Sequence, residues 1–158
     1  MEYDFRTDIL LIADDFYDAY KRCREGKNPV HFDGAIKYSA CNIPAIVNGS
    51  FALELYFKIM LPPKTWGHKL KELYDNLSSE IKCEIIAAVT FHLTKLAWGK
   101  QFEEYLEDLN NVFVDWRYIC EKNYAIGYLG NRINEYLQVL EILIPVVKEI
   151  TYKYKKNL

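Results

Sequence analysis

Apolar residues recur at every third or fourth position along most of this chain, a spacing that places them on one face of an α-helix. The pattern is clearest over residues 102–120 and 133–150, and a more continuous apolar stretch covers residues 43–61. No segment has the sustained alternation of apolar and polar residues, bounded by turn residues, that predicts a strand. The sequence therefore predicts an all-α fold, a single-domain bundle of about five to six helices.

Size and charge narrow the class of protein further. The chain has 158 residues, of which 51% are apolar, enough for one domain with a hydrophobic core and too few for two comfortable ones. We expect the core to extend over about residues 4–150, followed by a basic helix end at 151–158. The net charge of −2 and the 27% of charged residues favour neither a disordered chain nor a strongly basic nucleic-acid-binding domain.

Glycine and proline predict the ends of the first helices. The first should begin near Phe5 and stop before Gly26, with its three central acidic residues on the solvent face: Asp14, Asp15 and Asp18. Residues 25–42 should form the longest irregular connection, with a short turn around 35–39. The second helix should run from Pro44 to Leu61, because proline suits a first helical position and Pro62-Pro63 ends the pattern.

The later helices have boundary signals of the same kind. A short helix is expected at about residues 68–77, and Ser78 or Ser79 should cap the next one, which Gly99 should close. Pro145 should kink or interrupt the last helix.

The chain is expected to be cytoplasmic, with no membrane span. Its acidic N-terminus lacks the basic and apolar regions of a signal peptide, and Glu54 and Lys58 interrupt the most apolar stretch. The four cysteines have no close spacing of the kind that zinc sites use. We therefore expect reduced thiols and no metal ion.

The common enzyme motifs are missing from the sequence. There is no glycine-rich dinucleotide or phosphate loop, no G-x-S-x-G, no H-E-x-x-H and no EF-hand loop. No Glu is followed three residues later by His, as di-iron bundles require. The sequence therefore predicts no cofactor.

Two groups of polar residues remain as candidates for function. Ser50, Glu54 and Lys58 are spaced four apart, so they share one face of an otherwise apolar helix. His68 follows Gly67 at the start of the short helix, where it either satisfies backbone groups or has a functional role. His92, between two apolar neighbours, is expected to be partly buried.

Arg117 lies beside the apolar stripe of residues 102–120 in a chain that has few arginines. It is four residues before Glu121, so the two share a helix face. A planar guanidinium beside an apolar seam suits an interface ion pair or a phosphate contact. The alternative is a structural salt bridge between Arg117 and either Glu121 or Glu54.

Three segments together resemble the HEPN-domain proteins, which are small prokaryotic helical bundles. They are IPAIVNGSFALELYFK at residues 43–58, GHKLKELY at 67–74 and WRY at 116–118. The resemblance covers roughly residues 1–150. It implies a small helical bundle that is often a homodimer, with links to toxin–antitoxin, abortive-infection, other defence or mobile-element systems. Many members are metal-independent ribonucleases that use an Arg-x(4–6)-His motif.

This chain departs from that motif, because Lys122, Asn123 and Tyr124 occupy the positions after Arg117 where the histidine is expected. The sequence therefore favours a degenerate HEPN-like domain that binds RNA, a nucleotide or a protein partner without cleavage. One alternative is a metal-independent endoribonuclease with a rearranged site. Another is a plain dimerisation or scaffold module. We expect a homodimer formed through apolar faces of the later helices.

The candidate site residues follow from these hypotheses. The candidate catalytic residues are Arg117, His68 and Glu121, and the candidate ligand-binding residues are Tyr118, Glu54, Lys58, Asn48 and Lys69.

Overall fold

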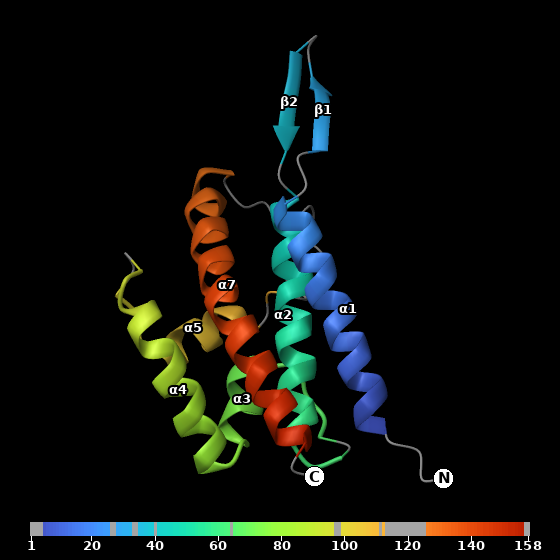
Figure 1. The fold of residues 1–158 in the computed structure, drawn as a ribbon. Helices are drawn as coiled ribbons and strands as arrows, with labels where there is room; N and C mark the ends of the chain where they lie inside the picture. Colours follow the sequence, from blue (N-terminus) through green and yellow to red (C-terminus); the bar gives the residue numbers. More distant parts are fainter. Residues whose placement is uncertain are drawn as a thin grey trace.

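The fold is a helical bundle with one small hairpin (Figure 1). The computed structural model describes residues 5–25, 28–32, 35–39, 41–63, 65–96, 99–110, 112 and 126–156. In chain order the elements are α1 (Phe5–Glu25), β1 (Asn28–Phe32), β2 (Ala35–Ser39), α2 (Asn42–Ile59), α3 (Leu70–Asp75), α4 (Ser79–Leu93), α5 (Phe102–Leu109) and α7 (Ile126–Lys156). The predicted single-domain helical bundle is confirmed.

Helix α2 is the central element of the bundle. It lies between α1 and α7, and α4 packs against the other side of α7 (Figure 1). Most of the α2 side chains are buried, as its nearly continuous apolar sequence predicts. A Cβ atom at Gly49 would lie 2.8 Å from Tyr20 Cδ2 and 3.1 Å from Ile144 Cδ1. Gly49 therefore lets α1 and α7 approach the backbone of α2 closely.

Several predicted helix ends are confirmed. Helix α1 ends at Glu25, just before Gly26. Helix α2 extends from Asn42 to Ile59, so it begins two residues before the predicted Pro44 and ends two residues before the predicted Leu61. Ser78 caps α4, since its side chain accepts a hydrogen bond from the Ile81 backbone N–H at 3.4 Å. This hydroxyl satisfies one of the backbone donors that the first turn leaves without an intrahelical partner.

Other boundaries differ from the predictions. Helix α4 ends at Leu93, well before Gly99, which adopts a left-handed φ of 62° in the connection to α5. Helix α5 covers only Phe102–Leu109, and most of the remaining apolar stripe up to residue 120 lies outside the described residues. Helix α7 continues through Pro145, so the proline does not break the helix, and a kink at this position stays a prediction.

The connection between α1 and α2 contains a two-stranded antiparallel sheet, so the prediction of an irregular connection without strands is wrong there. The register pairs Asn28 with Ser39 and Phe32 with Ala35. Two five-residue strands are too short to give a clear alternation. The sequence between them is Asp33-Gly34, a pair that favours two-residue hairpin connections. That local signal indicates the hairpin better than periodicity does.

Within the described residues, no helix is both long enough and apolar enough to cross a membrane.

Candidate functional site

The candidate site is built around Glu54, a carboxylate in the apolar environment of α2. Its side chain is only 2% exposed. Its Oε1 atom accepts a 2.7 Å hydrogen bond from Lys58 Nζ, one helical turn further along α2. A buried carboxylate is costly unless an opposite charge or a hydrogen-bond donor compensates it. Lys58 supplies both, and the predicted shared face of Glu54 and Lys58 is confirmed.

His68 supplies the second partner of Glu54 from the loop before α3. Its Nδ1 atom lies 2.9 Å from the same Oε1 atom, while the side chain is 70% exposed. His68 precedes Leu70, the first residue of α3, so its ring contacts a carboxylate from another element and does not cap the helix. Within the described part of the chain, the Nε2 atom has no hydrogen-bond partner.

Gly67 determines how the chain reaches this position. Its φ of 121° lies in a region that side chains other than glycine rarely adopt, and no atom lies within 4 Å of the place where a Cβ would be. The glycine is therefore required by the backbone conformation and not by crowding. This conformation turns the chain so that His68 reaches back over Glu54.

The arrangement has a defined chemical capability. A carboxylate that accepts from Nδ1–H fixes the imidazole tautomer and ring orientation, and it leaves Nε2 available toward solvent. In its neutral form such a ring can accept a proton at Nε2, and in its charged form it can donate to a phosphate oxygen. Lys58 adds a positive charge beside the ring and is itself 18% exposed.

The remaining predicted site residues divide into two groups. Lys69 pairs with Glu72 at 2.8 Å, and the described hydrogen bonds and ion pairs of Glu54 do not include it. Asn48 forms a hydrogen bond with the Cys23 thiol of α1, about 9 Å along α2 from Glu54 at the helical rise. Both therefore lie outside the Glu54 cluster. Arg117, Tyr118 and Glu121 lie outside the described residues.

Two further expectations concern neighbouring polar residues. Ser50 lies on the same α2 face as predicted, but its side chain is buried and its Oγ atom has no hydrogen-bond partner among the described residues. His92 is exposed, contrary to the prediction, and its ring meets Phe91 edge-on at a centroid distance of 5.6 Å. Among the described residues, no group of three or more His, Cys, Asp or Glu side chains is placed to hold a metal ion.

A cleft of about 310 Å³ adjoins the Glu54 cluster. Lys58 belongs to both, since it lines the cleft and also binds Glu54. At the edge of the cleft is Trp66, whose side chain is 88% exposed. A tryptophan left this exposed is unusual in a protein surface, because burial of the ring is normally favourable.

A second carboxylate cluster, centred on Asp14, was missed by the sequence analysis, which placed Asp14 on a solvent face. Its Oδ1 atom accepts a hydrogen bond from Tyr56 Oη at 2.5 Å and forms an ion pair with Lys148 Nζ at 2.9 Å. Its Oδ2 atom accepts a hydrogen bond from Tyr152. The donors come from α2 and α7, so this one carboxylate connects α1 to both neighbouring helices.

The hydrogen bonds of Asp14 change the pKa values in the cluster. Burial by itself raises the pKa of Asp14, but the bonds from Lys148, Tyr152 and Tyr56 outweigh burial, and the pKa is lowered. The hydrogen bond to Asp14 and partial burial raise the pKa of Tyr152 to about 12. Burial and the same carboxylate raise the pKa of Tyr56. The cluster therefore favours an ionised aspartate and neutral tyrosines over the whole neutral pH range.

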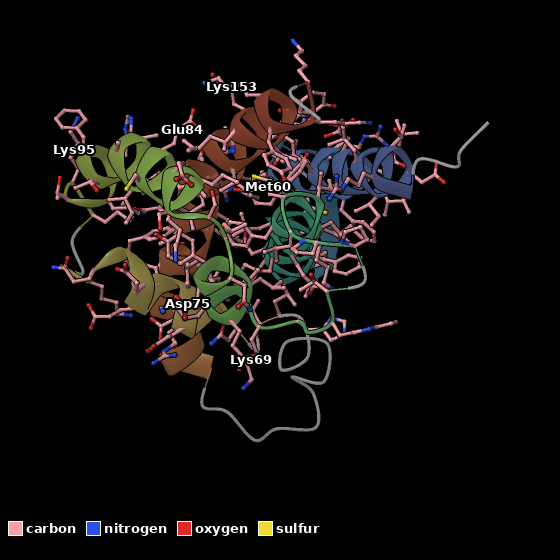
Figure 2. The ribbon with its side chains drawn as sticks, turned by 90° about the horizontal axis from the view of Figure 1, so that it is seen from below. Met60, Lys69, Asp75, Glu84, Lys95 and Lys153 are labelled. Atoms are coloured by element: carbon pink, nitrogen blue, oxygen red, sulfur yellow. The ribbon has the colours of Figure 1, made fainter. Side chains whose placement is uncertain are left out.

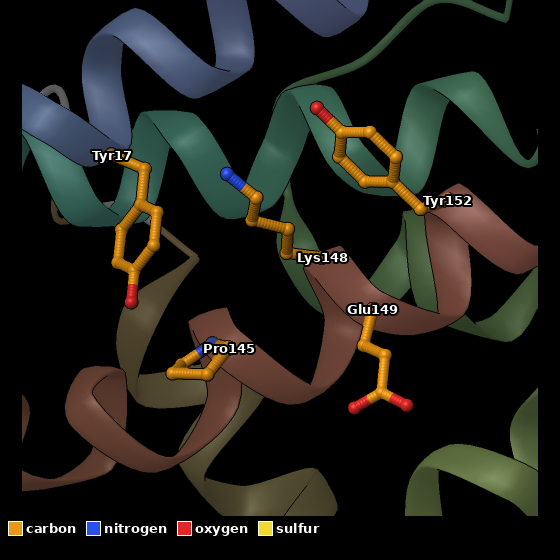
Figure 3. Close-up of a pocket in the computed structure, with 5 residues that line it drawn as sticks. All are labelled: Tyr17, Pro145, Lys148, Glu149 and Tyr152. Atoms are coloured by element: carbon orange, nitrogen blue, oxygen red, sulfur yellow. The ribbon is translucent and has the colours of Figure 1, made fainter.

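A pocket of about 440 Å³ lies over this second cluster, and Figure 3 shows Lys148 between the rings of Tyr17 and Tyr152. The Lys148 ammonium lies 5.3 Å and 5.6 Å from the two ring centroids, within the range of cation–π attraction. Its charge is thus already engaged by Asp14 and by both aromatic rings. The spacing of Lys148 and Tyr152, one helical turn apart in α7, was the only local signal for this cluster.

No protein-family model matches the chain, and comparisons with curated proteins and with solved structures likewise give no match. The resemblance to HEPN-domain proteins therefore stays a prediction.

Proposed function

We propose that this chain is a HEPN-like helical protein that binds single-stranded RNA through its phosphates without cleaving it. The proposal includes the cellular context that the resemblance implies, a toxin–antitoxin, defence or mobile-element system. The observation that carries it is the Glu54 cluster, in which a buried carboxylate holds His68 and Lys58 at the surface. Trp66, which is exposed, and Arg6, which is partly buried, line the cleft beside them.

The charge distribution of this surface suits a phosphate. Glu54 is buried beneath its partners, so its negative charge is not presented to a ligand. The His68 ring is 70% exposed, and the mostly buried Lys58 side chain is 18% exposed. An ammonium has three N–H donors, and Glu54 accepts from only one of them in Lys58. The remaining donors and His68 Nε2 can contact phosphate oxygens. Such contacts supply much of the affinity of proteins for nucleic acids.

Metal-independent cleavage is the second candidate function, and the hydrogen bond between His68 and Glu54 favours it specifically. A histidine oriented by a buried carboxylate is the usual form of a general base, and Nε2 could accept the proton of a ribose 2′-hydroxyl. The sequence lacks the histidine expected five to seven residues after Arg117. We therefore place binding first.

Fluorescence anisotropy with a labelled, unstructured RNA oligonucleotide tests the proposal. We expect His68→Ala and Lys58→Ala each to weaken binding by roughly tenfold, the loss of about one charge-assisted hydrogen bond. Lys95→Ala is the matched control, because Lys95 follows the C-terminal end of α4, well away from Lys69 (Figure 2). Among the described residues, its ammonium lies over the Phe91 ring. Absence of binding by the unchanged chain would refute the proposal.

The same RNA, analysed on a denaturing gel without added metal, distinguishes the second candidate. Cleavage products that form with the unchanged chain and disappear with His68→Ala would identify a ribonuclease. Full-length RNA bound at the same affinity throughout would support binding without cleavage.

The predicted homodimer is part of the proposal. Helix α4, one of the later helices, exposes Ile86 and Phe91, which makes it one apolar surface that a second copy could cover. Sedimentation equilibrium of the full chain tests this prediction, and a monomer at micromolar concentration would contradict it. A dimer that does not bind RNA would instead favour the plain dimerisation module.

A further inference from the structure

The helix that follows His68 is too short to be stable by itself. Helix α3 has six residues, Leu70–Asp75, and an isolated helix of this length is marginal in water. Its N-cap residue is Lys69, whose ammonium has only donors and cannot accept from the N–H groups of the first turn. The start of α3, two residues after His68, therefore depends on contacts from other elements.

Buried apolar side chains hold the body of α3 between α2 and α5 (Figure 1). The exposed fractions of Leu70, Leu73 and Tyr74 are 2%, 2% and 3%. The Tyr74 ring meets Phe102 of α5 edge-on at a centroid distance of 5.0 Å, and it lies 6.2 Å from the Phe57 ring of α2. These contacts anchor the helix, but they leave the N–H groups of its first turn without acceptors.

Asn110 supplies an acceptor for this turn from another helix. It is the C-cap residue of α5, and its Oδ1 atom accepts a 2.8 Å hydrogen bond from the backbone N–H of Lys71, the second residue of α3. Asparagine commonly makes this kind of bond from the N-cap position of the same helix. Here it comes from 39 residues further along the chain, so the bond ties the first turn of α3 to the end of α5.

His68 consequently lies between two attachments to the rest of the fold. On one side its own Nδ1 atom is 2.9 Å from Glu54 Oε1 of α2. On the other side, three residues along the chain, the backbone is bonded to Asn110. The residue before His68 is Gly67, and glycine restricts the backbone less than any other residue. The attachment at Asn110 therefore limits how far the ring can move away from Glu54.

We propose that Asn110 is a positioning residue for His68, which holds the first turn of α3 so that Nδ1 stays directed at Glu54 and Nε2 toward solvent. The inference rests on the proposed function, because it assigns a role in RNA binding through the position of the ring. The position itself can be measured in the chain without RNA.

The tautomer of the neutral His68 ring is the direct readout. Long-range proton–nitrogen NMR correlation spectra of the full chain in alkaline solution distinguish a proton on Nδ1 from one on Nε2, and His68→Ala identifies the His68 signals among those of the three histidines. We expect the Nδ1–H tautomer in the unchanged chain, since Glu54 accepts at Nδ1. Asn110→Ala should give a mixture of tautomers. Asn110→Asp, which keeps an acceptor for Lys71, should preserve the Nδ1–H form.

Asn76→Ala is the matched control from the other end of the same short helix. Asn76 follows the last residue of α3, and its Nδ2 atom donates to the Glu72 carbonyl at 2.9 Å. This variant should leave both the tautomer and the RNA affinity unchanged. Asn110→Ala should weaken RNA binding by about threefold, the lower end of the net contribution of one hydrogen bond, and Asn110→Asp should recover most of the affinity.

A second substitution makes the test independent of one variant. Asn110→Gln displaces the same amide by one methylene, so it should act in the same direction as Asn110→Ala. Circular dichroism should show the same helix content in all of these variants, because the buried side chains of α3 are unchanged.

The outcomes separate this inference from the proposed function. An unchanged His68 tautomer in Asn110→Ala would overturn the inference, whatever the RNA affinity. An equal change in Asn76→Ala would also overturn it, since any loosening of α3 would then move the ring. If the tautomers respond as expected and the unchanged chain does not bind RNA, the positioning of His68 is supported and the proposed function fails. A changed tautomer with full RNA affinity would overturn the role of Asn110 in binding.

Discussion

The two carboxylate clusters of this protein use similar residues for different purposes. Asp14 and Glu54 lie on adjacent helices, and each accepts from a lysine and from a ring-bearing side chain. The partners of Asp14 come from α2 and α7, so the bonds hold three helices together. Those of Glu54 come from its own helix and from a loop, and the His68 ring remains 70% exposed.

This difference identifies which cluster is available to a ligand. The donors of Asp14 are engaged within the fold, and Lys148 is additionally enclosed by two aromatic rings (Figure 3). At Glu54 the buried member is the carboxylate, and its partners keep unused hydrogen-bonding capacity at the surface. We therefore interpret the Asp14 cluster as a stabilising connection and the Glu54 cluster as the candidate functional site.

Replacement of Asp14 should have the largest effect on stability. Asp14→Ala removes the acceptor of the buried Tyr56 hydroxyl and the counter-charge of Lys148, so we expect a loss of about 3 kcal/mol in the free energy of unfolding. Urea denaturation measures it. RNA binding under folding conditions should not change.

The control for this substitution is the neighbouring residue. Asp15→Ala removes an identical charge from the exposed face of α1, and its effect should lie within about 0.5 kcal/mol. Equal losses for the two variants would contradict the role assigned to Asp14.

Compared with Asp14→Ala, Glu54→Gln should lower the stability less and the RNA affinity more. We expect a loss of about 2 kcal/mol, smaller than at Asp14 because Lys58 and His68 can turn toward water when the charge is removed. RNA affinity should fall as far as it does for His68→Ala, since the ring is no longer held. A variant with unchanged RNA affinity would show that Glu54 does not position His68.

The sequence predicted the parts of these clusters that depend on local spacing. Glu54 and Lys58 are one helical turn apart, so their pairing follows from the helix itself. The contact of His68 with Glu54 spans the loop that contains Pro62 and Pro63, so helical spacing does not predict it. A charged residue such as Asp14 is normally assigned to solvent. Asp14 is partly buried by contacts with tyrosines on two other helices, which periodicity cannot reveal.

The fold, like the two clusters, could be predicted only where local residue spacing determines the structure. Apolar periodicity identifies the helices because it reflects the face that each buries. It does not indicate the hairpin, whose strands are five residues each. Nor does it indicate the end of α4 at Leu93, since the apolar pattern continues to Leu96 without the helix.

Gly67→Ala tests whether the loop conformation serves the Glu54 site. The substitution should cost about 1 kcal/mol in stability, because alanine resists a positive φ. It should also weaken RNA binding by moving His68. Gly99→Ala is the matched control, since Gly99 also has a positive φ with open space around it, and it should lose similar stability with unchanged RNA affinity. Equal RNA binding by the two variants would contradict the role of Gly67.

The smallest expected effect is a pH dependence that belongs to Asp14. Its pKa in the folded chain is lowered from the ordinary value of 3.8, so the folded state favours the ionised form. The resulting stabilisation is fully present above the unfolded pKa, and it is lost as the pH falls through the lowered folded value. Asp14→Asn should therefore flatten the acid limb of a plot of unfolding free energy against pH, measured by urea denaturation between neutral and acidic pH. Since Asp18 and Glu80 also have lowered pKa values, some slope should persist in this variant.

An acid limb identical to that of the unchanged chain would mean that the bonds to Tyr56, Lys148 and Tyr152 do not favour the charged carboxylate. The stabilising role assigned to Asp14 would then rest on packing alone.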